Sequence, residues 1–155
     1  MNRTAPLLAA AALLLVPIAA GAAPHTEKDI RFELPKGFVV EERYETEPGE
    51  EDDKLYVGRR GTVEVRAEVE DGLLDCEAEL KGERRAAKTA AGRETCEIEA
   101  AGPPALGDQI VERRAAMVAV QFEGRHFTVI VFAPGASAAM SLARQVAASA
   151  VEARK

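Results

Sequence analysis

The sequence predicts an α+β fold, in which a twisted antiparallel sheet carries a C-terminal helix on one face and a shorter helix comes from the middle of the chain. Three observations lead to this prediction. Residues 117–132 alternate like a two-stranded hairpin, residues 137–150 have helical spacing, and residues 71–87 have a helix-forming composition. A sheet with an apolar face needs a second layer to cover it, and the C-terminal helix is the expected cover.

The hairpin is predicted by its turn and by its alternating side chains. Glu123-Gly124 suits a two-residue turn, because glycine accepts the positive φ that such turns require. This turn predicts three cross-strand pairs: Phe122–Arg125, Val120–Phe127 and Val118–Val129. One face is then almost wholly apolar and must be covered: Val118, Val120, Phe122, Phe127, Val129 and Val131. The other face is mixed and is expected to be covered only in part: Met117, Ala119, Gln121, His126, Thr128, Ile130 and Phe132.

A helix is predicted after the hairpin. Pro134-Gly135 ends the second strand, and Ser137 is expected to cap the helix by accepting a backbone N–H of its first turn. The apolar residues recur at intervals typical of one helix face: Ala139, Leu142, Ala143, Val146 and Ala150. Their small size predicts that the helix lies close to the sheet.

Residues 71–87 allow two interpretations. As a helix, the segment places Leu73, Cys76 and Leu80 on one face, and its composition favours this state. As a strand, Leu74, Cys76, Ala78 and Leu80 also alternate, and Asp71-Gly72 is a hairpin signal. We expect the short helix.

Further strands are predicted by alternation at residues 30–34, 38–40, 55–57, 63–69 and 96–100. Residues 41–53 contain eight acidic residues, one Arg and a central Pro48-Gly49. A calcium site is conceivable there, but the spacing lacks the ligand pattern of an EF-hand. Self-repelling charges favour an acidic, solvated loop instead.

The amino end is predicted to be a secretory signal peptide, residues 1–22. Arg3 precedes an apolar run over residues 5–20, and Ala20-Gly21-Ala22 offers small residues for cleavage after Ala22. Residues 23–155 would then form a single exported domain, periplasmic or secreted, that has no membrane span after cleavage and begins with a flexible segment at residues 23–29.

The charge balance excludes several partners. The whole chain has a formal net charge of −6, and the mature chain has −7 because Arg3 is the only charged residue of segment 1–22. Nucleic acids and anionic lipid surfaces require basic surface, so neither is an expected partner. The chain also contains no Trp, which leaves few aromatic side chains for base stacking.

Cys76 and Cys96 are the only cysteines. In an exported protein such a pair is expected to form a disulfide, which would close a loop of about 20 residues and stabilise the fold by roughly 3 kcal/mol. A redox-active dithiol is the alternative, although redox pairs usually lie close together as C-x-x-C.

One short stretch carries a family resemblance. Phe32-Glu33-Leu34-Pro35-Lys36-Gly37-Phe38 resembles the opening strand, Pro-x-Gly turn and aromatic residue of PsbP-like domains. The strand pair and helix near the C-terminus are similar in layout to the end of those domains. The resemblance implies a twisted antiparallel sheet between helices and an accessory or binding role rather than catalysis. No functional residue of the family has a matching motif here.

Catalytic motifs are not found in the sequence. His126 is the only histidine after His25, and no Gly-x-Ser-x-Gly elbow surrounds Ser137, Ser141 or Ser149. We therefore expect a non-enzymatic accessory protein that binds another protein or an envelope component, without cofactor or metal. The alternative is a small ligand carrier or enzyme that uses a cleft near Glu112, Arg114 and His126, because alternation places the first two as inward charges. Two other interpretations of these charges are that they lie beyond the edge of the core or that a bulge re-phases the strand.

Overall fold

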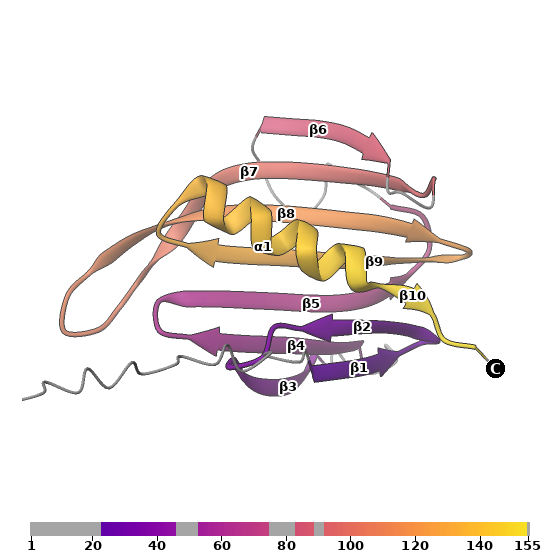
Figure 1. The fold of residues 1–155 in the computed structure, drawn as a ribbon, viewed down its shortest axis with the longest axis horizontal. Helices are drawn as coiled ribbons and strands as arrows, with labels where there is room; N and C mark the ends of the chain where they lie inside the picture. Colours follow the sequence, from indigo (N-terminus) through magenta and orange to yellow (C-terminus); the bar gives the residue numbers. More distant parts are fainter. Residues whose placement is uncertain (1–22, 46–52, 75–82, 89–91, 155) are drawn as a thin grey trace, which may run out of the picture.

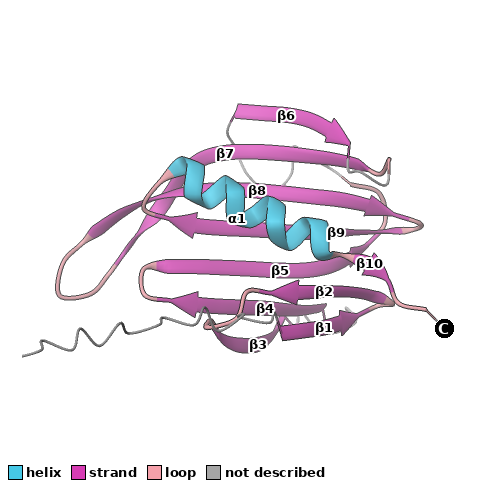
Figure 2. Ribbon diagram, viewed as in Figure 1, coloured by secondary structure: helices cyan, strands magenta, loops and turns pink. Residues whose placement is uncertain are grey.

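Two antiparallel sheets and a single helix make up the part of the chain that this computed structural model describes, residues 23–45, 53–74, 83–88 and 92–154 (Figures 1 and 2). The larger sheet has seven strands in the order β3 (Val39–Glu45), β4 (Asp53–Arg60), β5 (Val63–Asp71), β9 (Arg125–Ala133), β8 (Val111–Phe122), β7 (Glu94–Ala105) and β6 (Glu83–Lys88). The smaller sheet has the order β1 (Ala23–Glu27), β2 (Ile30–Leu34) and β10 (Val151–Glu152). The helix α1 spans Ala136–Ser149. The fold is therefore mostly β, and the predicted α+β class is wrong.

The central hairpin has the register that the sequence predicts. Val118 pairs with Val129, Val120 with Phe127 and Phe122 with Arg125 across β8 and β9. Gly124 has a φ of 70°, the left-handed conformation that the turn requires. A shift of the β8–β9 pairing by one residue would move every apolar side chain of one strand to the opposite face, so the alternation sets the register. The turn at Gly124 sets the same register.

The main core lies between the larger sheet and a layer formed by α1 and β2. Phe32 of β2 is fully buried, with its ring centroid 4.7 Å from that of Phe127 and 5.2 Å from that of Tyr56. On the helix, Ala139, Ala143 and Val146 are buried as predicted, and their small side chains allow α1 to lie across β8 and β9 (Figure 1). The apolar face of the hairpin is buried in this core as expected: Val118, Val120, Phe122, Phe127, Val129 and Val131.

The helix differs from the prediction at its first turn. Gly135 is the N-cap residue and makes no side-chain cap hydrogen bond, so the proposed cap by Ser137 is wrong. Met140 and Ala147 join the buried face, whereas Leu142 is only partly buried. The helix is thus rotated slightly from the expected face, which brings its one methionine into the core.

The predicted shorter helix over residues 71–87 is also wrong. β5 continues to Asp71, and Glu83–Lys88 form β6, which is antiparallel to β7. Residues 75–82 lie outside the described residues. β6 is one edge strand of the sheet. A charged, Ala-containing sequence suits such an edge as well as a helix, and pairing with β7 decides the outcome.

The segment expected to be flexible, residues 23–29, instead forms β1 and the turn to β2. Five residue pairs join the two strands, and Lys28 and Asp29 form the turn with φ values of 46° and 64°. A left-handed Lys is unfavourable by itself. The Lys28 ammonium compensates by binding Asp53 at 2.7 Å and Asp71 at 3.1 Å, which fastens the turn to the ends of β4 and β5.

Residues 41–45 and 53 of the expected acidic loop belong to β3 and β4, while residues 46–52 lie outside the described part.

The opposite face of the larger sheet is stabilised partly by ion pairs. Glu64 is buried and accepts hydrogen bonds from Arg66 Nε at 2.6 Å and Arg59 Nε at 3.0 Å. Burial by itself raises the pKa of Glu64, but the two arginines outweigh it and hold the pKa below its usual value. Arg59 continues the network to Glu41, and the Arg66 guanidinium lies 5.0 Å from the centre of the Phe132 ring. Beside this network is a second apolar cluster of Cys96, Ile98, Met117 and Ala119.

Ser149 connects the end of α1 to β2. Its hydroxyl oxygen accepts the backbone N–H of Glu33 at 2.9 Å, and the hydroxyl donates to the Val146 carbonyl at 2.6 Å. β10 pairs with β2 only at Ile30 and Arg31, so Ser149 supplies the acceptor for the Glu33 N–H beyond the end of that pairing.

We predict that Ser149→Ala lowers the free energy of unfolding by about 1 kcal/mol, because it leaves the Glu33 N–H without its acceptor. Urea denaturation measures the effect. Ser141→Ala is the matched control, since Ser141 is an exposed serine of the same helix, and it should leave stability unchanged. Equal effects of the two substitutions would contradict the assigned role.

Candidate functional site

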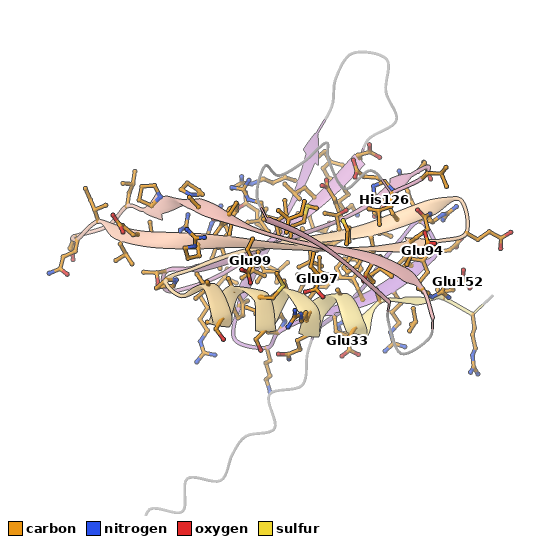
Figure 3. All side chains as sticks on the ribbon, turned by 90° about the horizontal axis from the view of Figure 1, so that it is seen from above. Glu33, Glu94, Glu97, Glu99, His126 and Glu152 are labelled. Atoms are coloured by element: carbon orange, nitrogen blue, oxygen red, sulfur yellow. The ribbon has the colours of Figure 1, made fainter. Side chains whose placement is uncertain are left out.

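The hairpin between β7 and β8 extends beyond the rest of the larger sheet (Figures 1 and 3). β6 pairs with β7 only from Glu94 to Glu99, and β9 pairs with β8 only from Arg114 onward. Residues 100–113, here called the arm, are therefore a two-stranded extension of the sheet. Elsewhere β7 and β8 each have a second neighbouring strand, β6 or β9. Projecting loops on a rigid scaffold are common positions for binding residues.

The arm has a local irregularity at its prolines. The pairing of β7 with β8 shifts register between Gly102 and Ala105, where Pro103 and Pro104 have no N–H to donate. A Cβ at Gly102 would lie 3.1 Å from the Arg113 carbonyl oxygen, which is tighter than most such contacts. Glycine at this position allows the two strands to approach each other just before the bulge.

Arg113 fastens the arm to the body of the protein. Its Nε donates to the Pro103 carbonyl at 2.8 Å within the arm, and its Nη1 donates to the Thr62 carbonyl at 3.2 Å in the turn between β4 and β5. The guanidinium also lies 5.4 Å from the centre of the Phe132 ring. These contacts hold the base of the arm in a fixed direction relative to the sheet.

The arm exposes apolar side chains. Leu106 is 82% exposed and Ile110 is 74% exposed. At the base of the arm lies a surface cleft of about 470 Å³, lined by Ala101, Gly102, Pro104, Ile110, Glu112, Arg113, Arg114 and Pro134. Exposed apolar groups beside a cleft are a physical mark of a binding surface.

Two of the three residues of the sequence-predicted cleft meet here. Glu112 and Arg114 both line the cleft, on the α1 side of β8, and both are exposed because they lie beyond the edge of the core. His126 lies at the other end of the hairpin and on the opposite face, with Nε2 2.9 Å from Glu70 and Nδ1 3.4 Å from the Gly72 carbonyl oxygen (Figure 3). The structure therefore does not bring His126 together with the other two.

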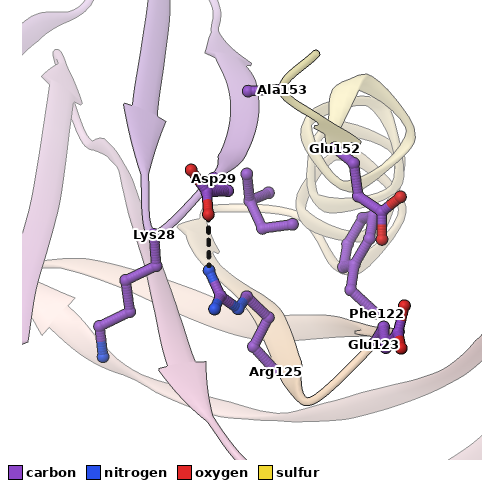
Figure 4. A pocket seen from close by; sticks show the side chains of 8 residues that line it. Lys28, Asp29, Phe122, Glu123, Arg125, Glu152 and Ala153 are labelled. Carbon is purple, nitrogen blue, oxygen red and sulfur yellow. Dashed lines mark ion pairs between the residues drawn. The ribbon is translucent and has the colours of Figure 1, made fainter. Parts of the chain in front are cut away.

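A second cleft, of about 360 Å³, lies at the opposite end of the sheet (Figure 4). Arg125 Nη1 faces Asp29 Oδ2 across it at 3.7 Å, while the Lys28 side chain turns away toward its own acidic partners. Its other lining residues are Ile30, Phe122, Glu123, Glu152 and Ala153. The lining contains two cations and three carboxylates, and both cations already pair with carboxylates of the chain itself.

A third cleft, of about 390 Å³, lies beside α1 and is lined by Glu99, Ser137, Met140, Ser141 and Arg144. Below it, Arg144 binds Glu97 at 2.6 Å, and Glu97 is buried on the α1 side of β7 (Figure 3). This ion pair, of which only the Glu97 end is buried, joins the helix to the sheet. The sequence analysis missed it, because the strand alternation gave no sign that a helix arginine would reach Glu97.

Among the described residues, no group of three or more His, Cys, Asp or Glu side chains is arranged to hold a metal ion. Within the same part of the chain, no helix has the length and apolar character that crossing a membrane requires. Cys96 is buried in β7, whereas Cys76 lies outside the described residues, so the Cys76–Cys96 disulfide stays a prediction.

The chain matches no protein-family model and no curated protein. The likeness to PsbP-like domains thus also stays an expectation.

His25 has an unusual environment in β1. Its ring stacks on Phe32 at 5.6 Å and lies 4.9 Å from the centre of the Tyr56 ring, and its buried Nε2 has no hydrogen-bond partner among the described residues. Burial lowers the pKa of His25, with a smaller opposing effect from Glu42. The folded protein therefore favours the neutral imidazole.

This pKa shift predicts a pH dependence of stability. Because the folded state binds a proton at His25 less readily than the unfolded chain does, this contribution to stability is present above the unfolded pKa of 6.5 and is lost as the pH falls below it. We expect His25→Phe, which keeps an aromatic ring in the stack, to lose less stability than the wild type between pH 7.5 and 5.5 in urea denaturation. Parallel pH profiles for the two proteins would contradict this assignment.

Proposed function

We propose that this protein is an exported, non-enzymatic accessory protein that binds another protein, and that the arm is its binding element. The observation that carries the proposal is the exposure of Leu106 and Ile110 on a hairpin that projects from the sheet and is fastened by Arg113. Exposed apolar residues on a fixed protrusion reduce the ordering cost of association.

The proposed export depends on the signal-peptide pattern of residues 1–22. Ala23, the residue that follows the predicted cleavage site, is the first residue of β1. Cleavage there would leave every strand of the described residues intact. The expected disulfide between Cys76 and Cys96 would fit an oxidising compartment outside the cytoplasm.

The alternative of a ligand carrier or enzyme receives less support from the geometry. It requires His126 beside Glu112 and Arg114, and these residues lie on opposite faces of the larger sheet. The cleft at the base of the arm has one acidic side chain, Glu112, and two basic ones, Arg113 and Arg114, but no histidine. Such a lining suits recognition better than proton transfer.

Site-specific photo-cross-linking in the producing cells tests the proposal. A photoreactive amino acid at Leu106 should give a discrete cross-linked species with a second protein. The same amino acid at Leu73, which is 84% exposed but lies outside the arm, is the matched control and should give none. Adducts at both positions, or at neither, would contradict the proposal.

The double substitution Leu106→Asp with Ile110→Asp should abolish the partner adduct when the photoreactive group is moved to the neighbouring Gln109. The denaturation midpoint should stay unchanged, because both replaced side chains are exposed. An undiminished adduct would show that the apolar residues of the arm do not bind the partner.

A further inference from the structure

The arm leaves one backbone edge open. β9 ends at Ala133, opposite Arg114, and Pro134 follows it, whereas β8 continues away from this point to Val111. Residues 111–113 pair with β7 on one side, and within the described ranges no strand pairs with them on the other. An edge of this kind is a template on which an extended peptide can add as a further strand.

The other edge of the arm is not equivalent. It belongs to β7, where Pro103 and Pro104 have no N–H to donate. Prolines at an edge oppose the addition of a strand. The open edge is therefore the β8 side of the arm, and this is also the side where Pro134 lines the cleft at the base.

From this geometry we propose that the arm binds an extended segment of a partner protein, which adds to β8 in the position where β9 would have continued. The proposal rests on the binding function proposed above and specifies its mode. The cleft of about 470 Å³ would hold the partner's side chains, and Arg113 would keep the edge in place before binding.

The pairing register of β8 with β9 predicts the sequence of the bound segment. Continuing the register past Ala133 sets successive partner residues opposite Arg113, Glu112, Val111 and Ile110. Glu112 and Ile110 share the face that lines the cleft. An opposing cation and an opposing apolar side chain satisfy these positions. The segment should therefore contain Lys or Arg, followed two positions later by an apolar residue.

A second copy of this chain is a weaker occupant. β9 covers the edge of β8 from Arg114 onward, so two copies could pair only through the short open stretch around residues 110–113. In a symmetric antiparallel pairing that sets Ile110 opposite Arg113, Glu112 would face Val111 and would lack an opposite charge. Charge complementarity thus favours a different chain with a basic residue.

Fluorescence polarisation with the full chain tests this inference. The probe is a dye-labelled peptide, Thr-Lys-Val-Val-Thr-Ser, whose Lys is set opposite Glu112 and whose second Val is set opposite Ile110. Glu112→Lys should weaken binding of this peptide by about five-fold and strengthen binding of the same peptide with Glu in place of Lys by a similar factor. The matched control is Glu123→Lys, an exposed acidic residue at the far end of β8, and it should change neither affinity.

Backbone methylation of the peptide supplies a second readout. Alternate residues of an added strand donate their N–H groups to β8, and the residues between them point their N–H groups away. N-methyl groups on the amides that face β8 should therefore abolish binding, whereas N-methyl groups on the other amides should not. Three outcomes would each overturn the strand-addition proposal. The two sets of N-methyl groups could have equal effects, the peptide could fail to bind at millimolar concentration, or Glu112→Lys and Glu123→Lys could change its affinity equally. A dimer in light scattering that Ile110→Asp disrupts would also overturn the proposal.

The two proposals fail separately. A partner adduct at Leu106 together with a negative peptide result would overturn strand addition and leave the binding function supported. Loss of the adduct would overturn the binding function itself.

Discussion

The fold depends on covering one apolar surface, the face formed by Val118 and Val120 of β8 with Phe127 and Val129 of β9. No single element covers it. The helix α1 lies over one part, and β2 contributes Ile30, Phe32 and Leu34 over another. Because α1 and β2 each cover only part of this face, a junction lies between the helix and the smaller sheet. Ser149 bridges that junction by a hydrogen bond to β2.

The opposite face uses different interactions. Glu64 with Arg59 and Arg66 forms a charged network across β4 and β5, and a small apolar cluster around Met117 lies further along the sheet. A buried carboxylate is tolerable there because two guanidinium groups bind it. The arm continues from this sheet, and Arg113 joins it to the network through the ring of Phe132, which Arg66 also contacts.

Local signals predicted the central hairpin correctly, because its turn and its alternation depend on neighbouring residues. The middle of the chain was different. The composition of Glu83–Lys88 fits a helix, and pairing with β7, which depends on residues far along the chain, makes it a strand. In the candidate site, alternation placed Glu112 and Arg114 on one face, and the structure brings both to one cleft. The sequence indicated that β9 ends at Pro134, but it could not show that β8 continues past that point in pairing with β7, nor that His126 lies with Glu70 instead.

The smaller sheet joins parts of the chain that are synthesised at very different times. β2 lies between β1 and β10, so its backbone pairs on one side with residues 23–27 and on the other with residues 151–152. Ile30, Phe32 and Leu34 therefore cannot reach their final packing until more than a hundred further residues have been added. This delays completion of the core until late in translation.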